Sequence, residues 1–252
     1  MEPNYEQPGL TPQPQEKPKR DFLLPASIMI AAVLISVSLV YNAGKKSPAT
    51  GAANLAGGVQ GTQAVDSLSL KPVTAADHIL GDPKAPIVMV EFSDLECPFC
   101  KRFQATLHQL MNDFPGKLAW VYRHFPLDAI HPKSRHEAEA AECANALGGN
   151  TAFWNFIDKI FEITPSNNGL DPALLTQTAT EIGLNTAQFQ ACLDSGKYAS
   201  IVNADVQDGL GAGTEGTPNT ILVANGKKYP VMGALPYDQV KLMIQAILAG
   251  NQ

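Results

Sequence analysis

"EFSDLECPFCKRF", residues 91–103, contains two cysteines, Cys97 and Cys100, separated by two residues. The pair follows an apolar run and precedes a segment whose apolar residues recur at helical spacing. Such a pair is a redox centre, half of a zinc site or a structural staple. The sequence on either side of the motif has to distinguish these three possibilities.

The segments that flank the motif predict a strand, a helix and a second strand. "APIVMVEF", residues 85–92, is a short apolar run rich in Val and Ile, typical of a buried central strand. Residues 97–111 carry Phe103, Leu107 and Leu110 on one helical face. "KLAWVYRHF", residues 117–125, predicts the next strand. The order indicates a βαβ unit.

The rest of the chain predicts a helical insertion and then a return to strands. Helical patterns fill residues 131–149, 152–161, 171–184 and 185–213. "NTILVANGKKYPV", residues 219–231, is typical of a hairpin because Asn-Gly favours a type I′ turn. A final helix is expected over residues 235–248. We therefore predict an α/β domain whose two halves are separated by a helical insertion at about residues 130–212.

The position of the cysteine pair favours redox chemistry. Pro98 is suited to the first position of a helix, so Cys97 becomes the N-cap and Cys100 lies one turn further. Free backbone N–H groups and the helix dipole there stabilise a thiolate, which makes Cys97 the nucleophile. Cys100 would then be the resolving thiol. A zinc site usually needs four ligands, and a staple over two residues constrains little chain.

The N-terminal part of the chain predicts a membrane anchor. Residues 1–21 are rich in Pro, Gln and Glu, which predicts a disordered tail. Residues 22–41 carry no charge and match the roughly 20 residues of a membrane-spanning helix. Positive charges flank both sides, three before the run (Lys17, Lys19, Arg20) and two after it (Lys45, Lys46), so the positive-inside rule only weakly favours a cytoplasmic tail. A cleaved signal peptide is the alternative. Residues 42–75 predict a flexible linker, and residues 76–252 the folded domain.

The other cysteines, the histidines and Arg123 are expected to have structural rather than catalytic roles. Cys143 and Cys192 fall on helices expected to be neighbours; on the oxidising side of a membrane we expect a disulfide, with two buried free thiols as the alternative. The net charge of −6 gives no basic field for nucleic acid. We expect no cofactor and no metal site, because His124, His131 and His136 fall on different elements. Arg123 is expected in a salt bridge.

Four segments in this order resemble the DsbA-like thiol:disulfide oxidoreductases of the thioredoxin superfamily. They are "VEFSDLECPFC", "VYRHFPL", "HPKSRHEAEAAECA" and "GTPNTILVANG". The resemblance covers roughly residues 76–250. It implies a thioredoxin fold interrupted by a helical domain, in agreement with the predicted insertion.

The resemblance also implies roles for individual residues. Cys97 corresponds to the family's nucleophile and Cys100 to its buried partner. Glu91 stands where a buried acid moves protons, although a solvent-facing strand residue is the alternative. Thr217-Pro218 corresponds to a Thr-cis-Pro pair that faces the active site and pairs with extended substrates.

Pro98 and Phe99 would complete the substrate-binding surface. The best-known strong oxidases of the family have His where this chain has Phe99. Phenylalanine cannot donate a hydrogen bond to the Cys97 thiolate, so a milder oxidant is expected.

These observations predict a membrane-anchored enzyme on the outer side of the bacterial cytoplasmic membrane. We expect a monomer that forms disulfides in reduced or misoxidised extracytoplasmic proteins. A membrane thiol oxidase or reductase would be its redox partner. The alternatives are a reductase or isomerase with the same fold, and a non-catalytic, chaperone-like binding module.

Overall fold

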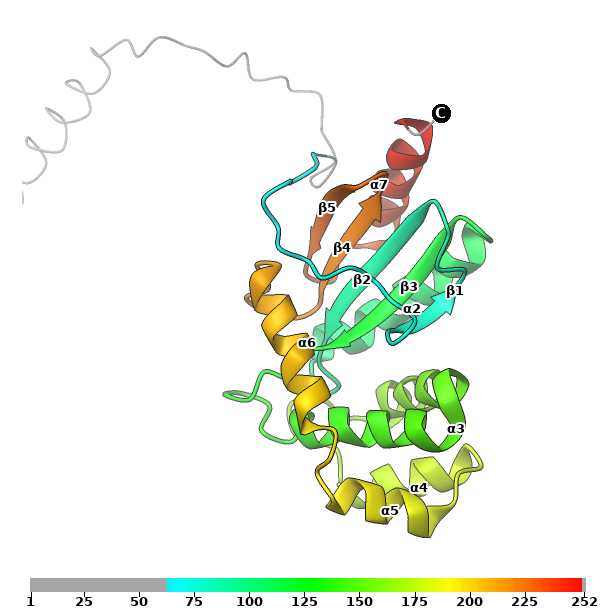
Figure 1. Cartoon of the computed structure of the whole chain (residues 1–252), viewed down its shortest axis with the longest axis vertical. Coiled ribbons are helices and arrows are strands. Elements are labelled where there is room, and N and C mark those ends of the chain that lie inside the picture. Colours follow the sequence, from blue (N-terminus) through cyan, green and yellow to red (C-terminus); the bar gives the residue numbers. More distant parts are fainter. Residues whose placement is uncertain (1–62, 251–252) are drawn as a thin grey trace, which may run out of the picture. The chain divides into compact units, whose positions relative to one another are not determined.

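The computed structural model describes residues 63–250, which fold around a five-stranded mixed sheet (Figure 1). The strand order is β1-β3-β2-β4-β5. β2 is parallel to β3, and the other three pairings are antiparallel. The strands are β1 (His78–Gly81), β2 (Ile87–Ser93), β3 (Leu118–His124), β4 (Asn219–Ala224) and β5 (Lys227–Met232).

The central strand β2 separates two hydrophobic cores. Alternate residues of a strand point to opposite faces, so Met89 joins the larger core and Val90 and Phe92 join the smaller one. Glu91 has the same parity as Met89 and therefore faces the larger core. Helices α2 (Pro98–Asp113) and α7 (Tyr237–Gly250) contribute buried residues to that core. The βαβ unit and the closing ββα unit are as predicted.

Four helices separate the two halves of the sheet. They are α3 (Ser134–Ile163), α4 (Ala173–Glu181), α5 (Thr186–Asp194) and α6 (Ala199–Gly211). The two helices expected over residues 131–161 form one element with a kink at Gly149, where φ is 71°. Figure 1 shows α3, α4 and α5 together at one end of the sheet, and α6 packs against β3. The predicted helical insertion is confirmed.

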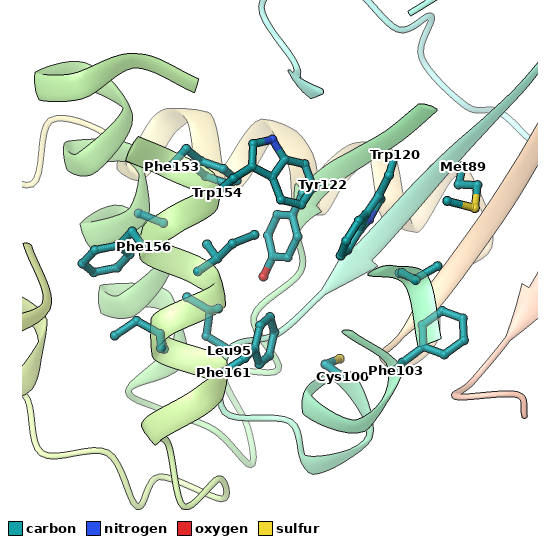
Figure 2. Close-up of a cluster of buried hydrophobic side chains, with 14 of the residues drawn as sticks. Met89, Leu95, Cys100, Phe103, Trp120, Tyr122, Phe153, Trp154, Phe156 and Phe161 are labelled. Atoms are coloured by element: carbon teal, nitrogen blue, oxygen red, sulfur yellow. The ribbon is translucent and has the colours of Figure 1, made fainter. Parts of the chain in front are cut away.

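Aromatic side chains join the sheet to the insertion. Trp120 and Tyr122 on β3 lie between Phe153 and Trp154 of α3 on one side and Cys100 on the other (Figure 2). The ring centroids of Trp120 and Trp154 are 4.7 Å apart in an edge-to-face arrangement. Such pairs stabilise by about 1 kcal/mol beyond their burial. The cysteine motif therefore rests on the core that connects both parts of the domain.

The hairpin turn is the one that the sequence predicts. Asn225 and Gly226 connect β4 to β5, and their φ angles are 50° and 74°. A type I′ turn needs positive φ at both central residues, which Gly adopts freely and Asn more readily than most residues.

Two boundaries differ from the sequence prediction. The expected linker ended at residue 75, but Leu68, Leu70 and Val73 pack against the smaller core, and the backbone N–H of Val65 donates to the carbonyl of Lys228. The three apolar side chains cover a sheet face that would otherwise meet water. Strand β1 was missed because its four residues are too few for a periodic signal, and its pairing with β3 defines it.

The predicted tail at 1–21 and anchor at 22–41 lie outside the described residues. Between residues 63 and 250, we find no helix with both the length and the apolar character needed to cross a membrane.

Candidate active site

Cys97 and Cys100 occupy the first turn of α2, directly after the loop that leaves β2. Cys97 is the N-cap residue, with extended backbone angles, and Pro98 occupies the first turn. Both residues are free thiols. Cys100 is fully buried, whereas Cys97, although only 3% exposed, lines a half-open cavity, which we call the active-site groove. One thiol is thus placed to meet another protein, and the other lies behind it.

The surroundings of the two thiols shift their pKa values in opposite directions. The pKa of Cys97 is lowered to about 6, because hydrogen bonds from the Cys100 thiol, from Thr217 and from the N–H groups of Phe99 and Cys100 outweigh burial. The pKa of Cys100 is raised well above its ordinary value, first by burial and then by the hydrogen bond and charge of Cys97. At neutral pH, Cys97 is therefore the thiolate and Cys100 the proton donor.

The groove brings Thr217 to the cysteine pair. Thr217 comes from the loop before β4, its peptide bond to Pro218 is cis, and its carbonyl oxygen lies 3.4 Å from the Cys97 sulfur. The groove has a volume of about 520 Å³. Apolar side chains stand at its edge, with Phe99 52% and Ile130 63% exposed. The Arg102 guanidinium lies over the Phe99 ring at 4.9 Å.

Glu91 lies in the larger core rather than in solvent. Its side chain is fully buried, and its Oε2 accepts a hydrogen bond from Trp120 Nε1 at 2.9 Å. Burial raises its pKa to about 7, although the hydrogen bonds that it accepts act in the opposite direction. Its charge is one of the causes that raise the pKa of Cys100. A carboxyl group that exchanges its proton near neutral pH therefore stands behind the thiol pair.

A buried acid missed by the sequence analysis holds the loop that carries Cys97. Asp94 Oδ1 accepts from the backbone N–H of Glu96 at 2.8 Å. Its Oδ2 accepts from the N–H of Leu127 at 2.7 Å and lies 3.0 Å from His131 Nδ1. Asp94 thereby fixes the cysteine loop to one wall of the groove. In the sequence, the only local sign of this role is the position of Asp94 between a predicted strand and the cysteine motif.

A pair of buried acids, Glu96 and Glu137, also escaped prediction from the sequence. Both are buried, and burial together with Glu96 raises the pKa of Glu137 to about 9. Glu96 Oε1 accepts the backbone N–H of Leu170 at 3.1 Å, and its carbonyl accepts that of Asn167 at 2.8 Å. These bonds connect the residue before Cys97 to the end of the segment after α3. Only the tertiary structure brings the two acids together.

Cys143 and Cys192 lie apart from this site. They come from α3 and α5 and are joined by a disulfide, with their Cα atoms 5.9 Å apart. The bridge closes a sequence separation of 49 residues within the helical insertion. Crosslinks over loops of this size typically stabilise by a few kcal/mol. This disulfide therefore lies in the helical insertion, apart from the two free thiols, Cys97 and Cys100.

The site has the parts that thiol:disulfide exchange requires. It offers a low-pKa thiol that lines the groove, a fully buried second thiol one turn away, and an acid whose pKa lies near 7. The attacking species in such exchange is a thiolate, and a low-pKa thiol is also the better leaving group. Among residues 63–250, Cys97 and Cys100 are the only free cysteines.

Known proteins match most of the folded domain. Residues 73–246 match the family model described as "Thioredoxin". A curated relative, Na(+)/H(+) antiporter NhaA 1 of Mycobacterium sp. (strain KMS), is 35% identical over 177 residues, which are 69% of this chain and 27% of that protein. The chain thus spans about a quarter of the length of the curated relatives that it matches first.

Two solved structures match the domain over nearly their whole length. DsbA2 of Pseudomonas aeruginosa is 28% identical, with a TM-score of 0.60 over 69% of this chain and 96% of that one. Oxidised BdbD of Bacillus subtilis is 27% identical, with a TM-score of 0.62 over 74% and 100%. The chain therefore belongs to the thioredoxin family, and its fold is that of the DsbA-like thiol:disulfide oxidoreductases.

Proposed function

We propose that this chain is a thiol:disulfide oxidoreductase that forms disulfides in extracytoplasmic proteins through Cys97 and Cys100. The observation that carries the proposal is the asymmetry of the pair: Cys97 lines the groove, while Cys100 is fully buried behind it. A substrate protein can therefore reach only one of the two sulfur atoms. The lowered pKa of Cys97 and the raised pKa of Cys100 agree with this division of roles.

The first step forms a mixed disulfide with the substrate. A substrate thiolate attacks the Cys97 sulfur of the Cys97–Cys100 disulfide, and the bond between the two enzyme sulfurs breaks. The electron pair leaves on Cys100, whose buried thiolate is unfavourable and takes up a proton. Glu91, with a pKa of about 7, can supply that proton.

The second step releases the oxidised substrate. A second substrate thiolate attacks the substrate sulfur of the mixed disulfide, and Cys97 leaves as a thiolate. Two electrons have passed from two substrate thiols to the enzyme, which now holds the dithiol. The lowered pKa of Cys97 makes it a good leaving group and stabilises the reduced enzyme, both of which favour oxidation of the substrate.

The proposed cellular setting follows from the N-terminal sequence. The uncharged run at residues 22–41 would anchor the chain in the bacterial cytoplasmic membrane, with residues 42–62 leading to the folded domain outside. A membrane thiol oxidase would return the dithiol to the disulfide. Protease added to spheroplasts should digest the domain while the membrane stays intact. A domain that resists until the membrane is opened would contradict this orientation.

The reduction potential of the Cys97–Cys100 pair tests the direction of the reaction. We expect a value between about −120 and −200 mV at equilibrium with glutathione, since strong oxidants of this kind lie near −120 mV. A value at or below about −270 mV, as in thioredoxin, would overturn the oxidant proposal and favour the reductase. The measurement uses the full-length chain, with Cys143→Ser/Cys192→Ser as a control that leaves only the active-site pair.

Replacing Glu91 with glutamine should slow the exchange reaction about a hundredfold, because the amide cannot give a proton to Cys100.

The same substitution should also change how the stability of the protein depends on pH. Burial raises the pKa of Glu91 from 4.5 to about 7, so the wild-type protein loses stability as pH rises through that range. The variant should lack this loss, a difference of a few kcal/mol above pH 7 by urea unfolding.

The control for this prediction is Glu162→Gln on the exposed surface of α3. It should change neither the rate nor the pH dependence of stability. A Glu91→Gln protein with the wild-type rate would show that Cys100 receives its proton from water instead.

Replacing Phe99 with histidine should make the pair more oxidising. An imidazole at this half-exposed position can donate a hydrogen bond to the Cys97 thiolate, and a bond to a charged group contributes about 1.5–3 kcal/mol. We expect the reduction potential to rise by about 30–60 mV. Phe99→Leu, which adds no donor, should leave it nearly unchanged. Equal potentials for the two variants would contradict the argument.

A further inference from the structure

A second cluster of chemically active side chains lies outside the active-site groove, where β1, β3 and α3 meet. His78 is on β1, His124 ends β3, and Glu142 is on α3. All three are buried. His78 Nε2 lies 2.7 Å from Glu142 Oε1, and His124 Nε2 lies 3.2 Å from the same oxygen. One donor atom from each residue thus falls within 4.8 Å of the other two.

We propose that His78, His124 and Glu142 bind a divalent first-row transition metal ion of the Zn²⁺ or Co²⁺ type. Imidazole nitrogen and carboxylate oxygen are donors that such ions prefer, whereas Ca²⁺ and Mg²⁺ favour sets of oxygen ligands. Three protein ligands leave at least one position for water or another small ligand. The proposal is independent of the thiol chemistry.

The donor geometry is close to that of a metal site. With metal–ligand bonds of about 2.0–2.2 Å, two donors of a tetrahedral ion lie about 3.3 Å apart. The two nitrogen–oxygen distances, 2.7 and 3.2 Å, are within about 0.6 Å of that value, and all three donor atoms lie within 4.8 Å of one another. His124 Nε2 is also a buried atom without a hydrogen-bonding partner, although it is directed at the carboxylate. A metal ion would give this nitrogen the partner that it lacks.

Packing fixes the two imidazole rings before any ion binds. The His78 ring stacks on Phe153, with centroids 3.5 Å apart and planes 9° from parallel. The His124 ring meets Tyr122 edge to face at 5.3 Å, and the backbone N–H of His124 donates to Asp205 Oδ2 at 3.0 Å. Rings held in this way lose little freedom on binding, which favours a specific site.

A half-open cavity of about 380 Å³ gives an ion access to the cluster. It reaches His78 and Glu142 between β1, β3 and α6. Among the described residues that line it, four carry carboxylates and two carry positive charges: Asp77, Glu142, Asp205, Asp208, Lys71 and Arg123. The excess of negative charge attracts cations. A bound ion would connect the sheet to the helical insertion through three different elements.

Titration of the full-length protein with Co²⁺ tests the proposal. The protein is first oxidised so that Cys97 and Cys100 form a disulfide and offer no thiolate. We expect one equivalent of Co²⁺ to give d–d absorption without a thiolate charge-transfer band. His78→Ala and His124→Ala should each weaken binding by at least about tenfold. His136→Ala, which removes an exposed histidine of α3, is the matched control and should bind as the wild type does.

A measurement on the unmodified protein keeps the test valid if the alanine variants fail to fold. In the Co²⁺-loaded wild type, paramagnetically shifted NMR signals should come from the rings of His78 and His124, and the melting temperature should rise with Co²⁺ concentration. Absence of stoichiometric binding, or shifted signals from His131 or His136 instead, would overturn the proposal. Binding that survives both alanine substitutions in folded protein would overturn it as well.

Discussion

Replacing Cys97 with serine should reduce disulfide formation in a reduced test protein to the uncatalysed rate. The hydroxyl of serine is not ionised near neutral pH and cannot form the mixed disulfide, so the first step is lost. Cys100 cannot substitute for it, because its side chain is fully buried and its pKa is raised well above the ordinary value. The rate is measured by refolding of the test protein under conditions where the uncatalysed reaction is slow.

Cys100→Ser is the matched variant, because it keeps the nucleophile and removes the resolving thiol. With glutathione disulfide it should accumulate glutathione on Cys97, detectable as a mass increase, whereas Cys97→Ser should accumulate none. The wild type should show only a transient adduct, since Cys100 attacks it. A Cys97→Ser protein with full activity would exclude the enzyme and support a chaperone-like binding module.

Replacing Arg123 with methionine should cost about 3–5 kcal/mol of folding stability. The Arg123 guanidinium is buried between Asp77 and Asp208, at 2.8 Å and 2.5 Å, and also donates to the carbonyl of Lys71 at 3.2 Å. Its removal leaves two acids without their cation, one of them, Asp208, almost fully buried. The bonds connect β3 to α6 and to the segment before β1. Urea unfolding followed by the fluorescence of Trp120 and Trp154 measures the loss.

Arg135→Met is the control for this prediction. Arg135 pairs with Asp128 at 2.6 Å, but both side chains are partly exposed, at 29% and 52%. Exposed pairs contribute about 0–1 kcal/mol because water competes with them. Equal losses for the two variants would mean that the buried network stabilises the domain no more than a surface pair does.

Features that depend on neighbours along the chain could be predicted from the sequence. The apolar run at residues 85–92 predicts a buried strand, and Pro98 places Cys97 at a helix start. Asn225-Gly226 predicts the hairpin. Each signal lies within a few residues, so it survives without knowledge of the fold. The four-residue strand β1 carried no such signal, and its partner β3 lies about forty residues away along the chain.

Local patterns predict the α/β plan, the helical insertion and the order of the two thiols in the first turn of a helix, and the family resemblance adds the thioredoxin fold. The family resemblance predicts Thr217 beside Cys97, whereas only the folded structure reveals Trp120 beside Glu91 and the two histidines, His78 and His124, around Glu142. The periodicity of apolar residues predicts which face of a helix or strand is buried, but it does not predict which residues of other elements pack against that face. That choice depends on how strands and helices pack, and packing brings together residues as far apart along the chain as Val65 and Lys228.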